Sequence, residues 1–299
     1  MKRAYVAACA VAAVVSTAMT GCTQQQREAA PQSLMYAEEV RLKDAEQLLV
    51  KRCMSRRGFT YHEHRPMTLE ELRPVGYVQD DIAWARKHGY GSRIAEKGNR
   101  ARQDNRNIAY RAALSNTKGR AYDTALNGGA GGPVVSADLP GTKTISKRVG
   151  GCAGEAEQRL YGDLGTWFTA DKTANSVRGL AQGKVLDDTR FTAKVERWAA
   201  CMKRAGHPYA DPGQAREAVQ RQSEQPQDAE AFEAERTTAV ADARCARQVS
   251  LRSVAEERLA HHIAKLCEEH SEYGDALHTI ARIQRDALAR AKRIVGPRA

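Results

Sequence analysis

CMSRRGFTY at residues 53–61 and CMKRAGHPY at residues 201–209 are two copies of one pattern, Cys-Met-x-x-x-Gly-x-x-Tyr. Each copy ends a segment in which apolar residues are spaced as in an amphipathic helix. In each copy we expect the cysteine to face the core from the last turn and the glycine to take the left-handed position that ends the helix. The tyrosine should then fold back over that end. The pattern therefore predicts two helices of similar design, over residues 34–57 and 188–205.

The rest of the chain is predicted to be mainly helical. Aromatic residues make up only 6% of it, and abundant Ala, Arg, Glu and Gln favour packed helices over a β-sandwich. Alternation around a turn at residues 139–141 predicts a two-stranded hairpin or an extended loop over residues 134–149. Further helices are expected over residues 80–88, 104–114 and 115–127, and from Cys152 through Leu164 toward Trp167. A linker marked by Pro208, residues 211–213 and Pro226 has room for a helical piece.

The C-terminal segment has the clearest apolar period. Its heptad seam is Leu259, Ile263, Leu266, His270, Tyr273, Leu277, Ile280, Gln284, Ala287, Ala291 and Ile294. The helix is expected to begin as early as Asp228, which gives a rod of about 100 Å if it is unbroken. The seam favours packing against earlier helices of the same chain, and a coiled-coil dimer is the alternative.

A leader precedes these segments. A positive Lys2-Arg3 pair is followed by an apolar run at residues 4–18, which fits a secretory signal and is short for a membrane span of about 20 residues. MTGC at residues 19–22 resembles the lipobox of bacterial lipoproteins. That resemblance implies removal of residues 1–21 and attachment of diacylglycerol to Cys22, whereas an ordinary signal peptide or an uncleaved span are the alternatives. The sequence thus predicts a lipid-anchored protein on the outer side of the cell membrane.

The mature chain is expected to have three parts. Residues 22–33 are Gln-rich and predict a flexible tether. Residues 34–150 form an N-terminal helical region with the hairpin or loop, and residues 151–299 a C-terminal helical region. The formal net charge of +11 falls to +9 when Lys2 and Arg3 leave with the leader. Outside the membrane, such a surface faces anionic lipid headgroups and acidic wall polymers, and the leader argues against nucleic acid.

Much of the positive charge lies in one stretch. Residues 86–120, the basic segment, hold ten Lys or Arg and two acidic residues, interleaved with Tyr90, Tyr110 and Tyr122. The segment is a candidate for binding an acidic wall polymer or anionic lipid. A solvated basic face without a partner is the alternative.

Five cysteines remain once Cys9 leaves with the leader and Cys22 carries lipid: Cys53, Cys152, Cys201, Cys245 and Cys267. Disulfides persist outside the cytoplasm. Two bonds and one leftover thiol can be arranged in fifteen ways, and spacing alone does not choose among them.

Three groups of residues carry a resemblance to a known group of proteins. They are the two Cys-Met-x-x-x-Gly-x-x-Tyr ends, GC-x-x-EA-x-x-x-LYG at residues 151–162 and AVAD-x-x-C at residues 239–245. With them, most of the mature chain is similar to a loosely defined group of actinobacterial secreted proteins and lipoproteins of unknown function. The resemblance implies Cys53–Cys152 and Cys201–Cys245 bonds. Independently, Cys245 and Cys267 lie about 33 Å apart if one continuous helix holds both, so they cannot bond. Cys267 is then the odd thiol, expected to be buried and unreactive.

Short matches to catalytic motifs are weak. Ser115 and Lys118 match the Ser-x-x-Lys of penicillin-recognising serine enzymes, but those enzymes also need an α/β fold and a Lys-Thr-Gly strand. The nearest equivalent, KTA at residues 172–174, has helical surroundings.

Metal-ligating residues occur without a decisive spacing. His62 and His64 would share one face of a strand and form a metal pair, and Met54 and Met202 are soft copper ligands. Four histidines follow the C-terminal segment near Cys267, namely His261, His262, His270 and His278. Solvated or half-buried histidines and helix-end methionines are the simpler interpretation.

The sequence therefore predicts an all-α lipoprotein of helical hairpins cross-linked by two disulfides, with a small hairpin or loop in the middle and a long C-terminal helix. We expect a non-enzymatic scaffold or binding protein of the cell envelope, without a cofactor. Its expected partners are the membrane through Cys22, a protein through the C-terminal helix, and an anionic polymer or lipid headgroups. A metal-binding carrier and an envelope hydrolase that uses Ser115 are the alternatives.

Overall fold

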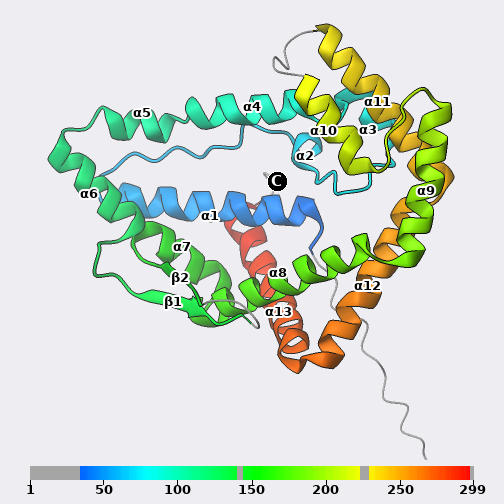
Figure 1. The fold of residues 1–299 in the computed structure, drawn as a ribbon. Coiled ribbons are helices and arrows are strands. Elements are labelled where there is room, and N and C mark those ends of the chain that lie inside the picture. The colour runs from blue at the N-terminus through cyan, green and yellow to red at the C-terminus, as the bar shows by residue number, and fades with distance from the viewer. Residues whose placement is uncertain (1–33, 140–143, 223–228, 297–299) are drawn as a thin grey trace, which may run out of the picture.

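The computed structural model describes residues 34–139, 144–222 and 229–296 and is all-α apart from one hairpin (Figure 1). The predicted leader, Cys22 and the tether lie outside these residues, as do Pro226 and most of the expected turn at residues 139–141. The elements are α1 (Tyr36–Arg56), α2 (Leu69–Leu72), α3 (Ile82–His88), α4 (Ser92–Gln103), α5 (Arg106–Ala112), α6 (Asn116–Asn127), β1 (Val134–Ala137), β2 (Ile145–Arg148), α7 (Gly151–Tyr161), α8 (Leu164–Leu186), α9 (Thr189–Arg204), α10 (Pro212–Gln222), α11 (Ala229–Gln248), α12 (Leu251–Glu269) and α13 (Ser271–Val295).

The first lobe is built around α1. Leu42 and Leu49 of α1 share a core with Leu160 of α7 and with Ala287 and Ala291 of α13. α6 packs on α7, and the antiparallel β1–β2 hairpin lies on α8. Figure 1 shows α1, α6, α7 and the hairpin together at one end of the molecule.

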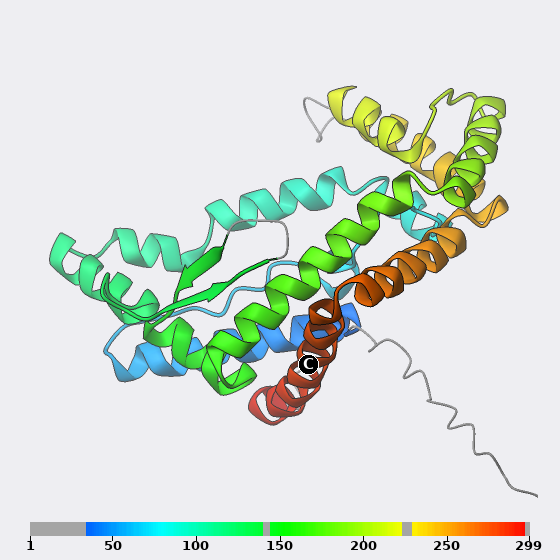
Figure 2. The same ribbon diagram turned by 60° about the horizontal axis from the view of Figure 1, so that its bottom comes forward.

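The second lobe is built around α9 and α11. Phe191, Trp198 and Met202 of α9 are almost fully buried and share a core with Ala246 of α11 and Leu251 of α12. α3 and α10 pack on α11. The two lobes are joined by α8 and α12, which run side by side between them (Figure 2).

The expected boundary between residues 150 and 151 does not separate the chain in space. α3, from the N-terminal region, packs on α11 of the second lobe. α7 and α13, from the C-terminal region, complete the core of the first lobe around α1. Each lobe therefore contains segments from both predicted regions.

The two repeated helix ends adopt the same geometry. Gly58 and Gly206 have φ of 77° and 85°. After α1, the Phe59 N–H donates to the Met54 carbonyl at 3.0 Å, and after α9 the His207 N–H donates to the Met202 carbonyl at 2.9 Å. With the shorter bonds from the glycine N–H groups, these are Schellman caps, which satisfy carbonyls that the helix leaves free. Tyr61 and Tyr209 pack against the two cores, so the predicted design is confirmed.

Both predicted disulfides are present. Cys53 is bonded to Cys152 and Cys201 to Cys245, with Cα atoms 5.5 and 5.7 Å apart. Each bond links the last turn of a repeated helix to a helix of the resembling motifs, α7 in the first lobe and α11 in the second. Cys267 is the one free thiol of the described part, and burial raises its pKa.

The long C-terminal helix is confirmed, but the prediction of an unbroken rod from Asp228 is wrong. The helix is interrupted at Ser250, which has φ of 56°, and at His270, which is extended. The breaks let α12 lie between α8 and α9 while α13 turns back against α8 and α1. Leu266 and Tyr273 keep the seven-residue step across the second break, so the period alone could not reveal it.

The seam is buried within the chain, which confirms packing against earlier helices. Tyr273, Leu277 and Ile280 pack against α8, and Ala287 and Ala291 lie in the core around α1. His270 is exposed at the break. A coiled-coil dimer through this seam would have to displace both cores.

Two other helices differ from expectation. The helix from Cys152 ends at Tyr161, because Gly162 adopts φ of 82° and Asp163 begins α8 by accepting a hydrogen bond from the Thr166 N–H at 2.8 Å. α4 has no counterpart among the predicted helices, and none of its side chains is buried. Among the helices of residues 34–139, 144–222 and 229–296, none has the length and hydropathy to cross a bilayer.

The disulfides should provide much of the net stability. They close loops of 99 and 44 residues, and loop-closure entropy predicts a loss of about 3–5 kcal/mol from the free energy of unfolding when either bond is removed. We expect C53A/C152A and C201A/C245A each to lower the denaturation midpoint strongly. C267A is the matched control, with a change below about 1 kcal/mol, and an equal effect of C267A would contradict the assignment.

Candidate functional site

The basic segment forms an outer edge of the molecule. α4 and α5 bury no side chain and run from the second lobe to α6 in the first (Figure 1). An extended stretch after α1 follows them, held where Asn107 bonds both the His62 N–H (2.7 Å) and the His62 carbonyl (2.8 Å). The segment is therefore a surface helix pair that spans the two lobes and contributes little to either core.

The tyrosines of the segment attach it to the two lobes at its ends. The Tyr90 hydroxyl donates to Asp242 at 3.1 Å in the second lobe. The Tyr110 and Tyr122 rings lie 5.7 Å apart in the first lobe, and the Tyr110 hydroxyl accepts from the Thr60 N–H. What the segment turns to solvent is thus its charge.

Four cations of the segment are exposed and make no ion pair, side-chain hydrogen bond or ring contact within the described part of the chain: Arg86, Arg106, Lys118 and Arg120. The others are engaged locally. The Arg111 guanidinium pairs with Asp123 at 2.7 Å, and Arg93 stacks 3.7 Å over the Phe232 ring. The free positive charge is concentrated on α5 and the start of α6, with Arg86 near the other end.

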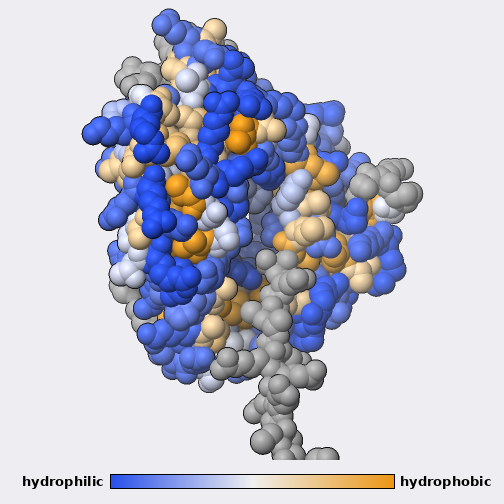
Figure 3. Space-filling model, turned by 90° about the vertical axis from the view of Figure 1, so that its right-hand side faces the viewer, coloured by the Kyte–Doolittle hydropathy of each residue, from blue (hydrophilic) through white to orange (hydrophobic). Residues whose placement is uncertain are grey.

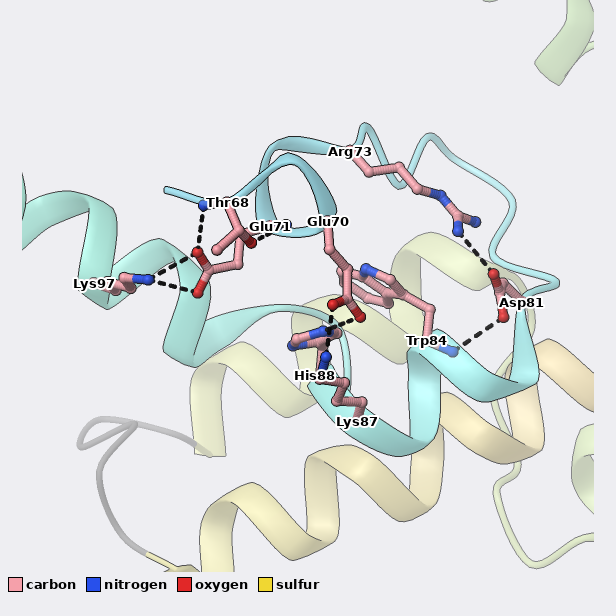
Figure 4. A network of polar contacts seen from close by, with 9 residues as sticks. All are labelled: Thr68, Glu70, Glu71, Arg73, Asp81, Trp84, Lys87, His88 and Lys97. Atoms are coloured by element: carbon pink, nitrogen blue, oxygen red, sulfur yellow. Dashed lines mark hydrogen bonds and ion pairs between the residues drawn. The ribbon is translucent and has the colours of Figure 1, made fainter. Parts of the chain in front are cut away.

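A polar network holds the start of the segment (Figure 4). Glu70 accepts from Lys87 at 2.6 Å and lies 3.0 Å from His88, and Lys97 reaches both oxygens of Glu71 at 2.8 Å. The hydrogen bonds from Lys87 and Lys97 lower the pKa values of Glu70 and Glu71 respectively. These exposed pairs stabilise little individually, but together they place the short α2 against α3 and α4.

The second lobe contains a buried acidic centre that was not predicted from the sequence. Asp242 is fully buried and accepts from the Trp198 indole at 2.9 Å and from Tyr90. Burial raises its pKa to about 6, although the charge of Arg216 and the two hydrogen bonds oppose that rise. Its sequence signal was the AVAD-x-x-C motif, in which Asp242 lies one turn before Cys245. The buried hydrogen bonds of Asp242 and the disulfide of Cys245 give this motif a structural explanation.

A second buried carboxylate adjoins it. Glu235 accepts from the Tyr90 N–H at 2.7 Å and from the N–H and hydroxyl of Ser92. Gly89, at φ of 62°, has no room for a side chain because a Cβ would meet Glu235 at 2.7 Å. Glu235 thus satisfies the start of α4 and fixes how the basic segment leaves the second lobe.

The predicted catalytic serine has a structural role. The Ser115 hydroxyl accepts from the Lys118 N–H at 3.4 Å and begins α6. Ser115 and Lys118 are both exposed. The structure brings no base or anion-stabilising group to this serine among the contacts of the described residues.

The metal-ligating candidates are not brought together. No group of three or more His, Cys, Asp or Glu side chains is arranged to hold an ion in residues 34–139, 144–222 and 229–296. Met54 and Met202 are fully buried beside the disulfides. His261, His270 and His278 are exposed, and His262 lies 2.9 Å from Asp188.

Asp188 links α9 to α12. It begins α9 by accepting from the Arg190 N–H and also receives the Arg258 guanidinium at 2.8 Å. Burial acts to raise its pKa, but the bonds from Arg258, the Arg190 N–H and His262 outweigh burial and lower the pKa to about 2. The contact fixes the angle between two helices of the second lobe.

Comparison with known proteins found no matching family model, no matching curated protein and no matching solved structure. The resemblance to actinobacterial secreted proteins and lipoproteins therefore stays a prediction.

The Asp242 centre should be essential to the second lobe. D242A leaves the Trp198 and Tyr90 donors without their acceptor and removes the negative charge near Arg216, and we expect a loss of about 3–5 kcal/mol in unfolding free energy. D242N keeps an acceptor for the indole and should fold.

The pH dependence of stability is a second test of this centre. In the wild type the pKa of Asp242 is higher in the folded state than in the unfolded state, so stability should fall as the pH rises from about 4 to 6. Denaturant titrations from pH 4 to 8 test whether D242N removes that slope; an unchanged slope would contradict the assignment.

For Asp188 we expect the opposite pH dependence of stability, in a lower pH range. Because its folded pKa is depressed, its contribution is present above the ordinary pKa near 4 and is lost as the pH falls toward 2. D188N should be less stable than the wild type at neutral pH, by about 1–2 kcal/mol, and should lose less stability on acidification. Thermal unfolding between pH 2 and 7 measures this, with the exposed Asp187→Asn as the control. If the stabilities of the wild type and D188N change in parallel with pH, the contacts of Asp188 do not contribute to stability.

Proposed function

We propose that the chain is a non-enzymatic binding or scaffold protein of the cell envelope, tethered outside the membrane through Cys22. Its contact surface is the basic segment, and the partner is an anionic wall polymer or the anionic headgroups of lipids. The observation that carries the proposal is the group of exposed cations on the basic segment, Arg86, Arg106, Lys118 and Arg120, that have no partner within the described part of the chain.

The energetics of the segment support this role. A surface helix without a buried stripe gains little from packing, yet α4 and α5 are fastened at both ends by Tyr90, Tyr110 and Asn107. The attachments hold the helices that carry Arg106, Lys118 and Arg120 in an ordered arrangement, and Arg86 lies at the other end of the segment, on α3. A pre-ordered row of charges loses less conformational freedom on binding than a flexible basic tail does.

The remaining surface favours an electrostatic contact over a hydrophobic one. The heptad face of α13 is buried within the chain, so a protein partner would have to use another face of that helix. On the side where α9 and α12 lie, hydrophilic residues predominate and hydrophobic ones form separate groups (Figure 3). No broad apolar face of the kind used by permanent complexes is visible there.

Neutralising the segment should weaken binding selectively. In R106Q/R120Q two of the unpaired cations are removed, and at about 1 kcal/mol for each cation near an anionic surface we expect a loss of about 30-fold in affinity. The measurement is binding of residues 23–299, which contain every described element, to phosphatidylglycerol-containing vesicles and separately to soluble polyglutamate. The two probes distinguish lipid from polymer.

K203Q/R204Q is the matched control, because both residues are exposed at the end of α9 in the second lobe and make no ion pair with the residues that the structure describes. It removes the same net charge and should leave affinity within about threefold of the wild type. Equal losses in the two variants would show that net charge alone attracts the ligand and would contradict a site on the basic segment.

A further inference from the structure

An acidic cavity lies between α8 and α13, away from the basic segment. Its volume is about 540 Å³, and Asp138, just after β1, and Gly165 contribute to its lining. The rest of the lining is two rows of four residues, one row on each helix, spaced at i, i+3, i+4 and i+7. Residues at these spacings share one face of a helix. The rows are Thr166, Thr169, Ala170 and Thr173 on α8, and Glu272, Asp275, Ala276 and Thr279 on α13.

The two rows are fixed in place by the packing of the helices that carry them. α8 and α13 pack against each other, and neighbouring faces of the two helices share the core of Val177, Leu277 and Ile280. Alanine occupies the i+4 position of both rows, and Ala170 and Ala276 are buried. Because these side chains are small, they leave space between the rows. The cavity is thus a fixed feature of the fold.

The lining carries negative charge and no positive charge. Asp138, Glu272 and Asp275 are exposed carboxylates, and no Lys, Arg or His is among the described residues that line the cavity. None of the three pairs with Lys or Arg in the described part of the chain, and the Nδ1 atom of His270 lies 3.7 Å from Glu272. In a chain with a formal net charge of +11, these carboxylates are available to a cationic ligand.

The threonines add hydrogen-bond acceptors to this charge. The Thr166 hydroxyl donates to Asp163 at 2.7 Å, and the Thr169 hydroxyl donates to the Ser136 carbonyl at 3.2 Å. A hydroxyl has one proton and two lone pairs, so toward a ligand these two can only accept. Thr173 is 5% exposed, and its hydroxyl makes no hydrogen bond within the described residues. A hydroxyl on so buried a side chain usually has a partner, and a ligand in the cavity would supply one.

We infer that this cavity binds a short linear polyamine through its ammonium groups. Carboxylates and hydroxyl lone pairs suit a ligand that is rich in N–H donors and positive charge. A primary ammonium group carries three N–H donors, which a carboxylate and neighbouring hydroxyls can accept together.

The spacing of the lining residues favours several linked charges over one ion. Among the described residues, no three His, Cys, Asp or Glu side chains are placed to hold a metal ion. The row from Glu272 to Thr279 is about 10 Å long, which leaves room for ammonium groups separated by short methylene chains. The inference does not depend on the basic segment, none of whose residues lines this cavity.

The test is a calorimetric titration of the full chain, in nonionic detergent at low ionic strength, with spermidine, putrescine and butylamine, which carry three, two and one amine. We expect one bound spermidine for each chain and an affinity that falls about fivefold with each ammonium group lost. Mg²⁺ at an equal concentration should displace little spermidine. Equal binding of the three amines, or full displacement by Mg²⁺, would overturn the proposal.

Variants locate the ligand in the cavity. E272Q/D275N removes two of the carboxylates and should weaken spermidine binding about tenfold or more. D187N/E217Q is the matched control, because both acids are exposed and make no ion pair with the residues that the structure describes. The control should bind spermidine within about threefold of the wild type. Equal losses in the two variants would show that spermidine responds to net charge alone and would contradict a site in the cavity.

Thr173→Val tests the buried hydroxyl. The variant should keep the fold, since no hydrogen bond among the described residues depends on that hydroxyl, and should weaken spermidine binding about fivefold. Circular dichroism and thermal unfolding check the fold. A folded Thr173→Val variant with wild-type affinity for spermidine would place the ligand outside the cavity.

Discussion

A cystine in the last turn of a capped helix is the constraint on which both lobes depend. The Schellman caps at Gly58 and Gly206 fix where α1 and α9 stop, and the cysteines beside them attach those ends to α7 and α11. Because helix end and cross-link coincide, the direction of the following chain is fixed as well. After α1 the chain returns along the basic segment toward α2, and after α9 it leads into α10.

The basic segment follows from that arrangement. It connects the two lobes and contributes Tyr90, Tyr110 and Leu114 to their cores, so most of its other side chains are free to be selected for solubility or binding rather than packing. Tyr90 enters the acidic centre of the second lobe, and Tyr110 enters the core of the first. Asp242 and Glu235 are unusual in a core that otherwise buries mainly alanines and aromatic rings. Their hydrogen bonds with Tyr90 attach the basic segment to the second lobe.

Local patterns predicted the elements better than their assembly. The repeated helix ends and the hairpin were recoverable from the sequence because cap residues and polar alternation act locally, and the disulfide pairing was implied by the resemblance. α4 was not predicted, because it is strongly polar and buries none of its few apolar residues. The breaks at Ser250 and His270 were hidden because Leu266 and Tyr273 stay in register across one of them. The Asp242 centre was missed for another reason: its residues come from segments as far apart as Tyr90 and Asp242, which only tertiary packing brings together.

The central claim, a disulfide-bonded protein anchored outside the membrane, is tested most directly by the intact mass of the native protein from the membrane fraction, alkylated without reduction. The account predicts a chain that begins at Cys22, carries acyl groups and gains a single alkyl group, at Cys267. A chain that retains residues 1–21, or one that gains five alkyl groups after the leader is lost, would contradict it.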